Sequence, residues 1–322
     1  MREVTVVIPN YNGQEFIGNC LESLRKQNKV SFDIVLVDNG STDNSVSIVK
    51  GDYPEVEVIS LPENTGFCGA VNVGIRNSKT KYVILLNNDT EVETNFVAEM
   101  VKSINAHPHA FSCAAKMLQY QQRDLIDDAG NLYNALGWAY ALGKGKFERS
   151  YAKERKVFSA CAGAAIYRRE LLNKMGLFDE EHFAYLEDTD IGYRALIYGY
   201  ENWFVPTARV YHIGSGTSGS RYNQFKIRYS SRNNIYMIAK NMPIGQIILN
   251  LPFLLLGFSI KIVFFISKGF GREYLAGIKN GFSLASKARK NGKKIPFKVE
   301  NFQNYLKIQI QLWTNILRKF VA

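Results

Sequence analysis

Short, largely apolar runs alternate with amphipathic segments along the first third of the chain. The segment from Phe16 to Leu24 repeats its apolar residues at helical spacing, whereas the apolar runs are typical of strands buried on both faces of a sheet. These runs are Val4 to Ile8, Asp33 to Val37, Val56 to Leu61 and Tyr82 to Leu86. Because strands and helices alternate at short intervals, we expect an α/β fold with a doubly wound, mostly parallel sheet flanked by helices.

Polar turn residues follow these strands, and in open α/β sheets ligands bind at the carboxyl ends of the strands. At that edge Tyr11 offers an aromatic surface for a base, Asp38 a carboxylate acceptor for a base N–H, and Asp89 a metal ligand for a diphosphate. A nucleotide requires all three features, so the pattern predicts a nucleotide site.

The fourth strand ends in Asn87, Asn88 and Asp89. Their oxygen atoms are hard ligands that suit Mg²⁺ or Mn²⁺ carrying phosphates, although all three residue types also favour turns. Two other nucleotide motifs are missing from the sequence: no GxGxxG follows the first strand, and no GxxxxGK[ST] occurs. The dehydrogenase and P-loop classes therefore lose their main support.

The middle of the chain continues with a helical pattern at 95–106 and a strand pattern at 111–117. The polar, Gly-rich and aromatic stretch 120–156 is predicted to form a long loop or hairpin over the site. In the apolar run 158–167, Gly163 permits a close approach of the backbone, either to a substrate or to a neighbouring element.

Three carboxylates, Glu187, Asp188 and Asp190, fall within four positions and are flanked by apolar residues. They either complement the dipole of a helix N-terminus or have raised pKa values that allow one of them to take a proton from a hydroxyl. His212 lies beside a Gly/Ser loop. It is either structural, or it completes a metal site or contacts a phosphate.

The chain has 322 residues, enough for one large domain or two modest ones. Its formal net charge of +11 indicates a polyanionic partner: nucleic acid, nucleotide phosphates or an anionic membrane. The four cysteines are scattered without a CxxC pair, and no secretory signal precedes the first strand. We therefore expect a reduced, cytoplasmic compartment.

The last third is both apolar and basic. Ile244 to Ile266 is long enough to cross a bilayer, but Asn250, Pro252 and Lys261 argue against a simple span. Basic residues then follow with only Glu273 opposing them: Lys268, Arg272, Lys279, Lys287, Arg289, Lys290, Lys293, Lys294 and Lys298. A final helical segment places five apolar residues close to one face: Phe302, Leu306, Trp313, Leu317 and Phe320.

Three interpretations of this region remain open. We favour peripheral attachment to an anionic membrane surface by amphipathic helices over a spanning or re-entrant segment and over a buried dimer or core helix. A nucleic-acid surface is disfavoured because the neighbouring residues are aliphatic and no nucleic-acid-binding motif is recognisable. A homo-oligomer is an open alternative.

Taken together, a series of ordered motifs over residues 3–235 resembles family 2 glycosyltransferases of the GT-A fold, especially their rhamnosyltransferase-like bacterial branch. The motifs are VVIPNYNG, VDNGSTDNS, NTGFCGAVNVGI, NND, GAAIYRRE, LEDTD, and YHIGSGTSG followed by Arg232-Asn233. The resemblance implies a GT-A domain at 1–235 and a helical, membrane-proximal region at 236–322. NND takes the place of the family's DXD motif, and its first acidic position is Asn87 here.

The resemblance also implies roles for individual residues. Asp188 would be the catalytic base, with Gly163, Glu187 and Asp190 on the acceptor side. Mg²⁺ or Mn²⁺ would be held by Asp89, with His212 as a second ligand. The donor-binding residues would be Pro9, Tyr11, Asn12, Asp38, Gly40, Asn64, Gly69, Asn72, Asn88 and Arg232.

The expected activity is an inverting transfer of a sugar, rhamnose from dTDP-rhamnose, to a glycan or lipid-linked glycan at the cytoplasmic face of the membrane. A UDP-hexose transferase of the same fold is one alternative, and an inactive nucleotide-sugar-binding or scaffold protein is another. A nucleotidyltransferase is disfavoured because PNYNG lacks the glycines and the basic residue of a triphosphate loop.

Overall fold

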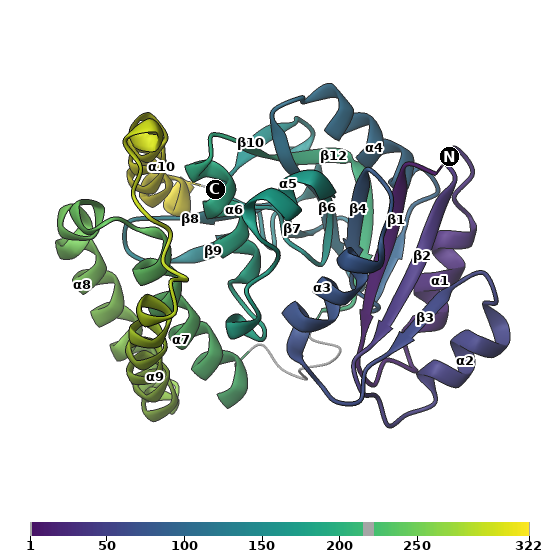
Figure 1. Cartoon of the computed structure of the whole chain (residues 1–322), viewed down its shortest axis with the longest axis horizontal. Helices are drawn as coiled ribbons and strands as arrows, with labels where there is room; N and C mark the ends of the chain where they lie inside the picture. Colours follow the sequence, from purple (N-terminus) through teal and green to yellow (C-terminus); the bar gives the residue numbers. More distant parts are fainter. Residues whose placement is uncertain (1, 215–221, 322) are drawn as a thin grey trace.

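The computed structural model of the chain describes residues 2–214 and 222–321. A mixed sheet runs through its centre, with helices on both faces (Figure 1). The strands are β1 (Val4–Asn10), β2 (Phe32–Asp38), β3 (Glu57–Ser60), β4 (Tyr82–Leu86), β5 (Thr90–Val92), β6 (Ala110–Gln119), β7 (Ile126–Asp128), β8 (Asn131–Tyr133), β9 (Ala139–Ala141), β10 (Arg155–Val157), β11 (Ala164–Arg168) and β12 (Glu201–His212). The predicted α/β class is confirmed.

The main path of the sheet has the order β10-β12-β6-β11-β4-β1-β2-β3. Strands β4, β1, β2 and β3 are parallel, as the alternation of strands and helices predicts. Strand β11 is inserted antiparallel between β4 and β6, and β12 then runs parallel to β6. The carboxyl ends of β1, β2 and β4 therefore meet at one edge of the sheet.

The helices are α1 (Ile17–Arg25), α2 (Ser45–Asp52), α3 (Gly66–Asn77), α4 (Phe96–Ala106), α5 (Arg169–Met175), α6 (Glu187–Ile197), α7 (Gln224–Asn241), α8 (Ile244–Ser267), α9 (Gly271–Lys290) and α10 (Phe302–Val321), with short 3-10 turns at Glu148–Tyr151, Glu180–His182 and Val299–Asn301.

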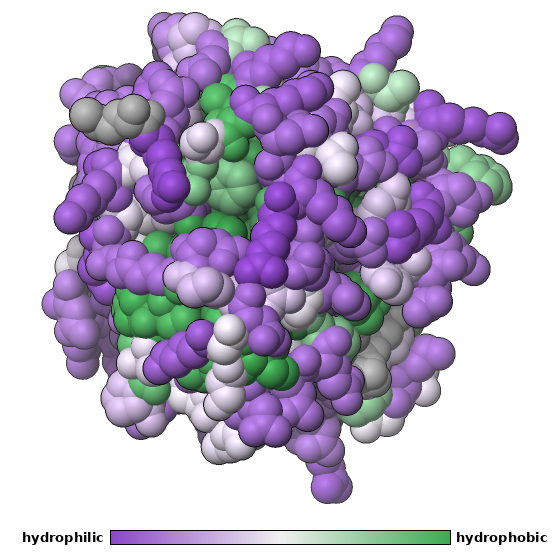
Figure 2. Space-filling view, turned by 90° about the vertical axis from the view of Figure 1, so that its right-hand side faces the viewer, coloured by the Kyte–Doolittle hydropathy of each residue, from purple (hydrophilic) through white to green (hydrophobic). Residues whose placement is uncertain are grey.

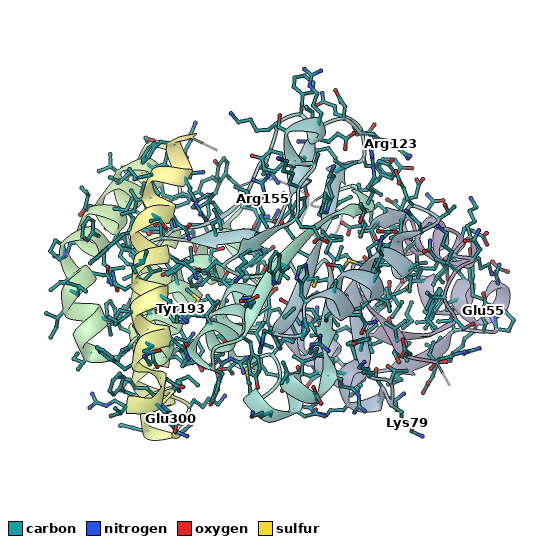
Figure 3. All side chains as sticks on the ribbon, turned by 90° about the horizontal axis from the view of Figure 1, so that it is seen from above. Glu55, Lys79, Arg123, Arg155, Tyr193 and Glu300 are labelled. Atoms are coloured by element: carbon teal, nitrogen blue, oxygen red, sulfur yellow. The ribbon has the colours of Figure 1, made fainter. Side chains whose placement is uncertain are left out.

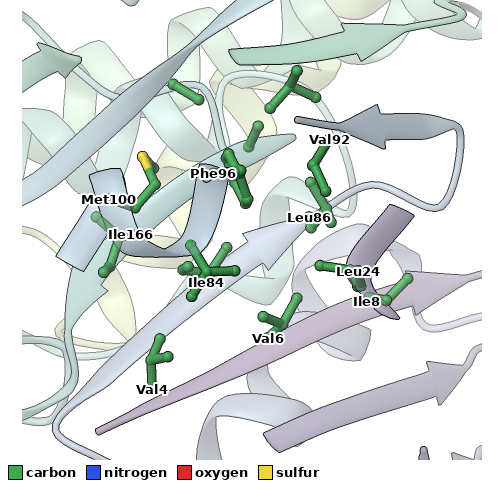
Figure 4. Packing of buried hydrophobic residues seen from close by; sticks show 14 of the residues in the cluster. Val4, Val6, Ile8, Leu24, Ile84, Leu86, Val92, Phe96, Met100 and Ile166 are labelled. Atoms are coloured by element: carbon green, nitrogen blue, oxygen red, sulfur yellow. The ribbon is translucent and has the colours of Figure 1, made fainter. Parts of the chain in front are cut away.

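Two apolar cores hold the helices against the sheet, because successive strand residues point to opposite faces. On one face Val4, Val6 and Ile8 of β1 pack with α1 and α4 (Figure 4). On the other face Val7 packs with α3, α5 and α6. The apolar runs of β1 and β4 are thus explained by burial on both sides.

A third core joins the sheet to the C-terminal helices. Tyr193 of α6 lies beside α10 (Figure 3) and shares this core with Tyr305, Ile308 and Leu312. A second apolar stripe of α10 is exposed. It consists of the residues predicted to share one face: Phe302, Leu306, Trp313, Leu317 and Phe320. Helix α10 therefore has two apolar stripes, and only one of them is buried in the chain.

The stretch 120–156 is more ordered than a loop. It contains β7 at the edge of the main sheet, the separate hairpin β8–β9, a 3-10 turn and the start of β10. The hairpin packs against α6 and α10. The stretch thus contains the predicted hairpin, and its other residues form short strands and a turn instead of one long loop.

Candidate active site

A cavity of about 1140 Å³ opens at the carboxyl ends of the parallel strands. Its walls come from the turns after β1, β2 and β4, from residues 161–163 before β11, from the segment leading into α6, and from the end of β12. It is thus located where the strand-end rule predicts a ligand site. Of the residues named from the sequence, the lining includes Pro9, Tyr11, Asn64, Asn88, Asp89, Gly163, Glu187, Asp188 and His212.

Asn10 and Asn39 organise the nucleotide end of this cavity. The amide of Asn10 donates to Asp38 Oδ1 at 3.2 Å and to Ser45 Oγ at 2.9 Å, and its oxygen accepts from Asn88 Nδ2 at 2.8 Å. Asn39 donates to Asn64 Oδ1 at 3.0 Å. Asp38 is therefore buried behind the lining, where it fixes the turn.

Four other residues assigned to the donor lie outside the lining of the cavity. Gly40 has φ +75°, and a Cβ there would lie 2.9 Å from the backbone of Glu63, so the turn itself requires glycine. Asn12 accepts from the backbone of Thr42 at 2.9 Å. Gly69 packs on Thr65, and Asn72 donates to Phe178 O at 2.8 Å. These four residues shape the turns and the packing of α3.

Gly163 both lines the cavity and packs closely against Asn87. A Cβ on Gly163 would come within 3.0 Å of the Asn87 side chain. Its carbonyl also accepts from the backbone N–H of Asn87 at 2.9 Å. Both alternatives drawn from the sequence are thus consistent with its position.

Asp89, His212 and Asp127 form a row at the diphosphate end. His212 Nε2 lies 3.4 Å from Asp89 Oδ1, and His212 Nδ1 lies 2.7 Å from Asp127 Oδ2. Burial opposes a charged imidazole here, but the hydrogen bonds with Asp127 and Asp89 outweigh it and raise the pKa of His212 to about 9. Lys144, 2.6 Å from Asp127, completes the row.

This row fits one divalent cation. Ligands of Mg²⁺ lie at about 2.0–2.1 Å, so two atoms 3.4 Å apart are within reach of one ion. A ligating histidine usually donates its other ring N–H to a carboxylate, which is the position of Asp127. Among the described residues no cluster of three or more histidine, cysteine or carboxylate side chains surrounds a single point. Two protein ligands would leave the other positions to phosphate oxygens and water.

Asp188, on the first turn of α6, also lines this cavity. Its Oδ2 accepts from Asn131 Nδ2 at 2.7 Å, and its Oδ1 accepts from the backbone of Thr189 at 2.6 Å. Burial raises the pKa of Asp188 to about 6 against these hydrogen bonds. Burial and the charge of Asp188 raise the pKa of Glu187 to about 8. Both carboxyl groups therefore hold a proton more readily than an exposed carboxyl group does.

Asp190 differs from this expectation. It lies outside the cavity lining, fully buried, with Lys240 Nζ at 2.9 Å, Arg194 Nε at 3.1 Å and Asn241 Nδ2 at 2.8 Å. Burial disfavours its charge, but the two cations outweigh it and hold the pKa of Asp190 well below its usual range. The predicted acceptor-side position is corrected: Asp190 anchors α6 to α7.

A strained turn presents the two acidic residues to the cavity. Phe183, Tyr185 and Leu186 all have positive φ, between 61° and 70°, which is costly for residues with a Cβ. Asn233 of α7 holds the turn by donating to the carbonyls of His182, Ala184 and Tyr185 at 2.7–2.9 Å.

Arg232 supports the same turn rather than the cavity wall. Its Nη2 donates to the carbonyls of Glu181 and His182 at 2.6 and 2.9 Å. Arg232 is not part of the cavity lining, and its contact with the donor stays a prediction. The Gly/Ser residues 215–219 of the histidine loop lie outside the described residues.

Sequence reasoning missed Asn39, Asp127, Asn131 and Asn233. Asn39 and Asn233 adjoin residues that it named, and their short polar side chains after a strand or within a helix were the available signal. Asp127 and Asn131 lie in a stretch of weak periodicity, far along the chain from His212 and Asp188. No local pattern indicates those two partners.

Comparison with known proteins gives a consistent result. The family model described as "Glycosyl transferase family 2" matches residues 5–176, just over half of the chain. The chain is 25% identical over 240 residues to N-acetylglucosaminyl-diphospho-decaprenol L-rhamnosyltransferase of Mycobacterium tuberculosis, covering 66% of this chain and 77% of that protein. It is 30% identical over 109 residues to teichoic acid poly(glycerol phosphate) polymerase of Staphylococcus epidermidis, and this match covers 33% of the chain and 15% of the polymerase. The chain thus spans well under two thirds of the polymerase.

Solved structures share the GT-A fold. A mannosyltransferase of Pyrobaculum calidifontis, solved with GDP-Man and Mn²⁺, has a TM-score of 0.56 at 15% identity and covers 97% of this chain and 85% of its own. Residues 1–349 of Staphylococcus aureus TarS, solved with UDP-GlcNAc, have a TM-score of 0.54 at 20% identity, covering 98% and 85%.

Proposed function

The chain belongs to glycosyl transferase family 2, and we propose that this glycosyltransferase inverts the anomeric carbon as it moves a sugar from a nucleoside diphosphate to a glycan or lipid-linked glycan. The observation that carries the proposal is the position of Asp188. It lines the same cavity as Asp89 and His212 and, with its pKa raised to about 6, is a carboxylate at neutral pH that still binds a proton readily.

The residues divide the work of a single displacement. The nucleotide would lie against Tyr11, Asn39 and Asn64, with its diphosphate near Asp89 and His212. Asp188 would take the proton from the acceptor hydroxyl as that oxygen attacks the anomeric carbon and the bond to the diphosphate breaks. Asn131 holds the Asp188 carboxylate by a 2.7 Å hydrogen bond.

Asp89 and His212 would hold a divalent cation, which when bound supplies positive charge to the leaving diphosphate. His212 binds a cation only in its neutral form, so binding would release a proton. In its protonated form the same imidazole would contact the diphosphate directly. Asp127 orients the ring in either case.

For the donor we propose dTDP-rhamnose, supported by similarity to a rhamnosyltransferase over 66% of the chain. UDP-glucose, UDP-galactose and UDP-GlcNAc are the alternatives. The name of the same relative supports an acceptor carried on a polyprenyl diphosphate.

We further propose peripheral attachment to the cytoplasmic face of an anionic membrane. Helix α8 is long and apolar enough to cross a membrane and exposes most of its apolar residues. The opposite face of the molecule, over α1, α2 and β3, is mainly hydrophilic (Figure 2). Asn250 of α8 is tied to Gln309 of α10 at 2.8 Å, a contact that favours a helix packed on the domain over one that spans a bilayer alone.

A donor screen tests the proposed activity. Hydrolysis and transfer are measured for dTDP-rhamnose, UDP-glucose, UDP-galactose, UDP-GlcNAc and GDP-mannose, each with Mn²⁺ or EDTA. Consumption of one donor identifies the sugar and supports an enzyme over an inactive binding protein. Binding of a donor without turnover would favour the inactive protein.

A further inference from the structure

A second cavity, of about 370 Å³, adjoins the first at Asp188. Its walls come from the β8–β9 hairpin, the start of α6, and the facing sides of α7, α8 and α9. Tyr185, Leu186, Asp188 and Lys226 line both cavities. Asp188 therefore stands between the proposed donor space and a space that reaches the apolar helix α8.

Lys261 places a basic group in the lining of this cavity. It lies on α8, the most apolar helix of the chain, and lines the cavity with its half-buried side chain. Its Nζ lies 5.9 Å from the centroid of the Trp138 ring. Within the described parts of the chain, no carboxylate lies within 4.0 Å of this amine.

An ammonium group in an apolar helix is costly unless an anion pairs with it. Burial, together with the nearby charge of Lys319, lowers the pKa of Lys261 to about 8. Lys226 adds a second amine to the lining, and Asp188 is the carboxylate at the inner end. Lys261, Lys226 and the aromatic walls give the cavity a chemistry suited to an anion attached to an apolar chain.

An apolar path leads away from Lys261 along α8. Ile260 and Phe264 are 43% and 38% exposed, and Phe265 stacks on Tyr274 at 4.9 Å between ring centroids. Phe265 and Tyr274 line the cavity, and Ile260 and Phe264 are exposed neighbours of Lys261 and Phe265 along the same helix. A chain leaving the cavity would therefore meet apolar side chains and, on a membrane, lipid.

We propose that the second cavity binds the phosphate or diphosphate of a lipid-linked acceptor, with Lys261 as its main contact and the lipid lying along α8. This inference rests on the proposed function and names the acceptor's anchoring group. It places the anion at one end of the cavity and the acceptor sugar at Asp188, so that charge recognition at Lys261 aligns the attacking hydroxyl with the base. Lys261 is a binding residue and takes no proton in the reaction.

The test measures binding of farnesyl diphosphate by calorimetry, with the donor cavity saturated by dTDP or UDP. A charge-assisted contact predicts that Lys261→Met weakens binding about tenfold or more, while Lys261→Arg keeps it within about threefold. Lys268→Met, at an exposed lysine that follows the same helix, is the matched control. Farnesol and inorganic pyrophosphate as competitors separate the contribution of the lipid from that of the anion. Melting temperatures confirm that each variant is folded.

Equal affinity of wild type and Lys261→Met for farnesyl diphosphate would overturn the inference, as would the absence of binding to wild type. Wild type and Lys261→Met could instead both turn over a nucleotide sugar with equal KM for a diphosphate-linked acceptor. That result would leave the proposed function intact and show that Lys261 does not bind the acceptor. No turnover of any donor would instead refute the proposed function, whatever farnesyl diphosphate does.

Discussion

At the scale of single residues, the acid–base behaviour of the site depends on Asp188 and Glu187. Both adjoin the same cavity, and each raises the cost of charging the other. Two neighbouring carboxyl groups titrate as a pair, so the lower of the pair's two pKa values sets the pH below which no carboxylate remains to act as base.

The pH profile follows from this titration. Because the pKa of Asp188 is raised to about 6 and only the carboxylate accepts a proton, kcat/KM should fall about tenfold per pH unit below pH 6 and level off above it. Initial rates between pH 4.5 and 8 measure the curve. A plateau that extends unchanged to pH 4.5 would contradict the role of Asp188 as base.

Asp89 carries the second prediction at this scale. Its carboxylate is buried and lies 3.4 Å from His212 Nε2. Asp89→Ala should weaken donor binding about tenfold or more with Mn²⁺, because a cation ligand is lost, and should change it little with EDTA. Titration of donor under both conditions, beside the exposed control Asp124→Asn, tests this. The same donor affinity in variant and wild type with Mn²⁺ would exclude Asp89 from a metal site.

At the scale of elements, α7 positions the base through side chains that lie outside the lining of the first cavity. Asn233 holds three carbonyls of the strained turn before α6, and Lys240 pairs with both Asp179 and Asp190 at 2.7 and 2.9 Å. Helix α7 thus fixes both the turn that presents Asp188 and the helix that carries it.

Asn233→Ala tests this support. The variant leaves one buried and two partly buried carbonyls without their donor, which costs about 1–3 kcal/mol. The strained left-handed residues Phe183, Tyr185 and Leu186 can then relax. We expect kcat to fall about tenfold or more, a lower melting temperature, and a donor Kd within about threefold of wild type. Asn173→Ala, at an exposed residue of α5, is the control. An unchanged kcat would show that the turn holds its conformation without Asn233.

The same elements show what sequence could and could not predict. Tyr11, Asn88 and Asp89 follow buried strands, and strand ends converge, so their meeting at one cavity was predictable. The lowered pKa of Asp190 could not be predicted, because Lys240 lies fifty residues away on α7 and only the tertiary fold brings the two side chains together. Asp127 and Asn131 were missed for the same reason: their partners come from distant elements.

At the scale of the whole molecule, one end exposes apolar side chains and the other is mainly hydrophilic. The apolar side chains that remain exposed gather on α8 and α10, and the basic residues of α9 and the following segment lie beside them in the chain. Basic residues near an anionic surface contribute about 1 kcal/mol each. The proposed acceptor cavity opens among these same helices.

Sedimentation with liposomes tests the proposed membrane contact. Wild type should pellet with phosphatidylglycerol vesicles at low salt, and high salt should partly release it because the charges are screened. Leu256→Asp, at a residue 55% exposed on α8, should lower the bound fraction, whereas Phe147→Asp, 51% exposed outside the C-terminal helices, should not. Failure of wild type to pellet at low salt would count against attachment. Resistance to both salt and alkaline washing would indicate a spanning helix instead.

The most direct test of the account is turnover by Asp188→Asn, measured beside wild type with the donor that the screen identifies. A positioned base contributes about 10²–10⁴-fold, so the variant should lose at least a hundredfold in kcat and bind the donor with unchanged Kd. Asp124→Asn, at an exposed carboxylate, should match wild type. Near-normal turnover by Asp188→Asn would contradict the central claim that this residue activates the acceptor.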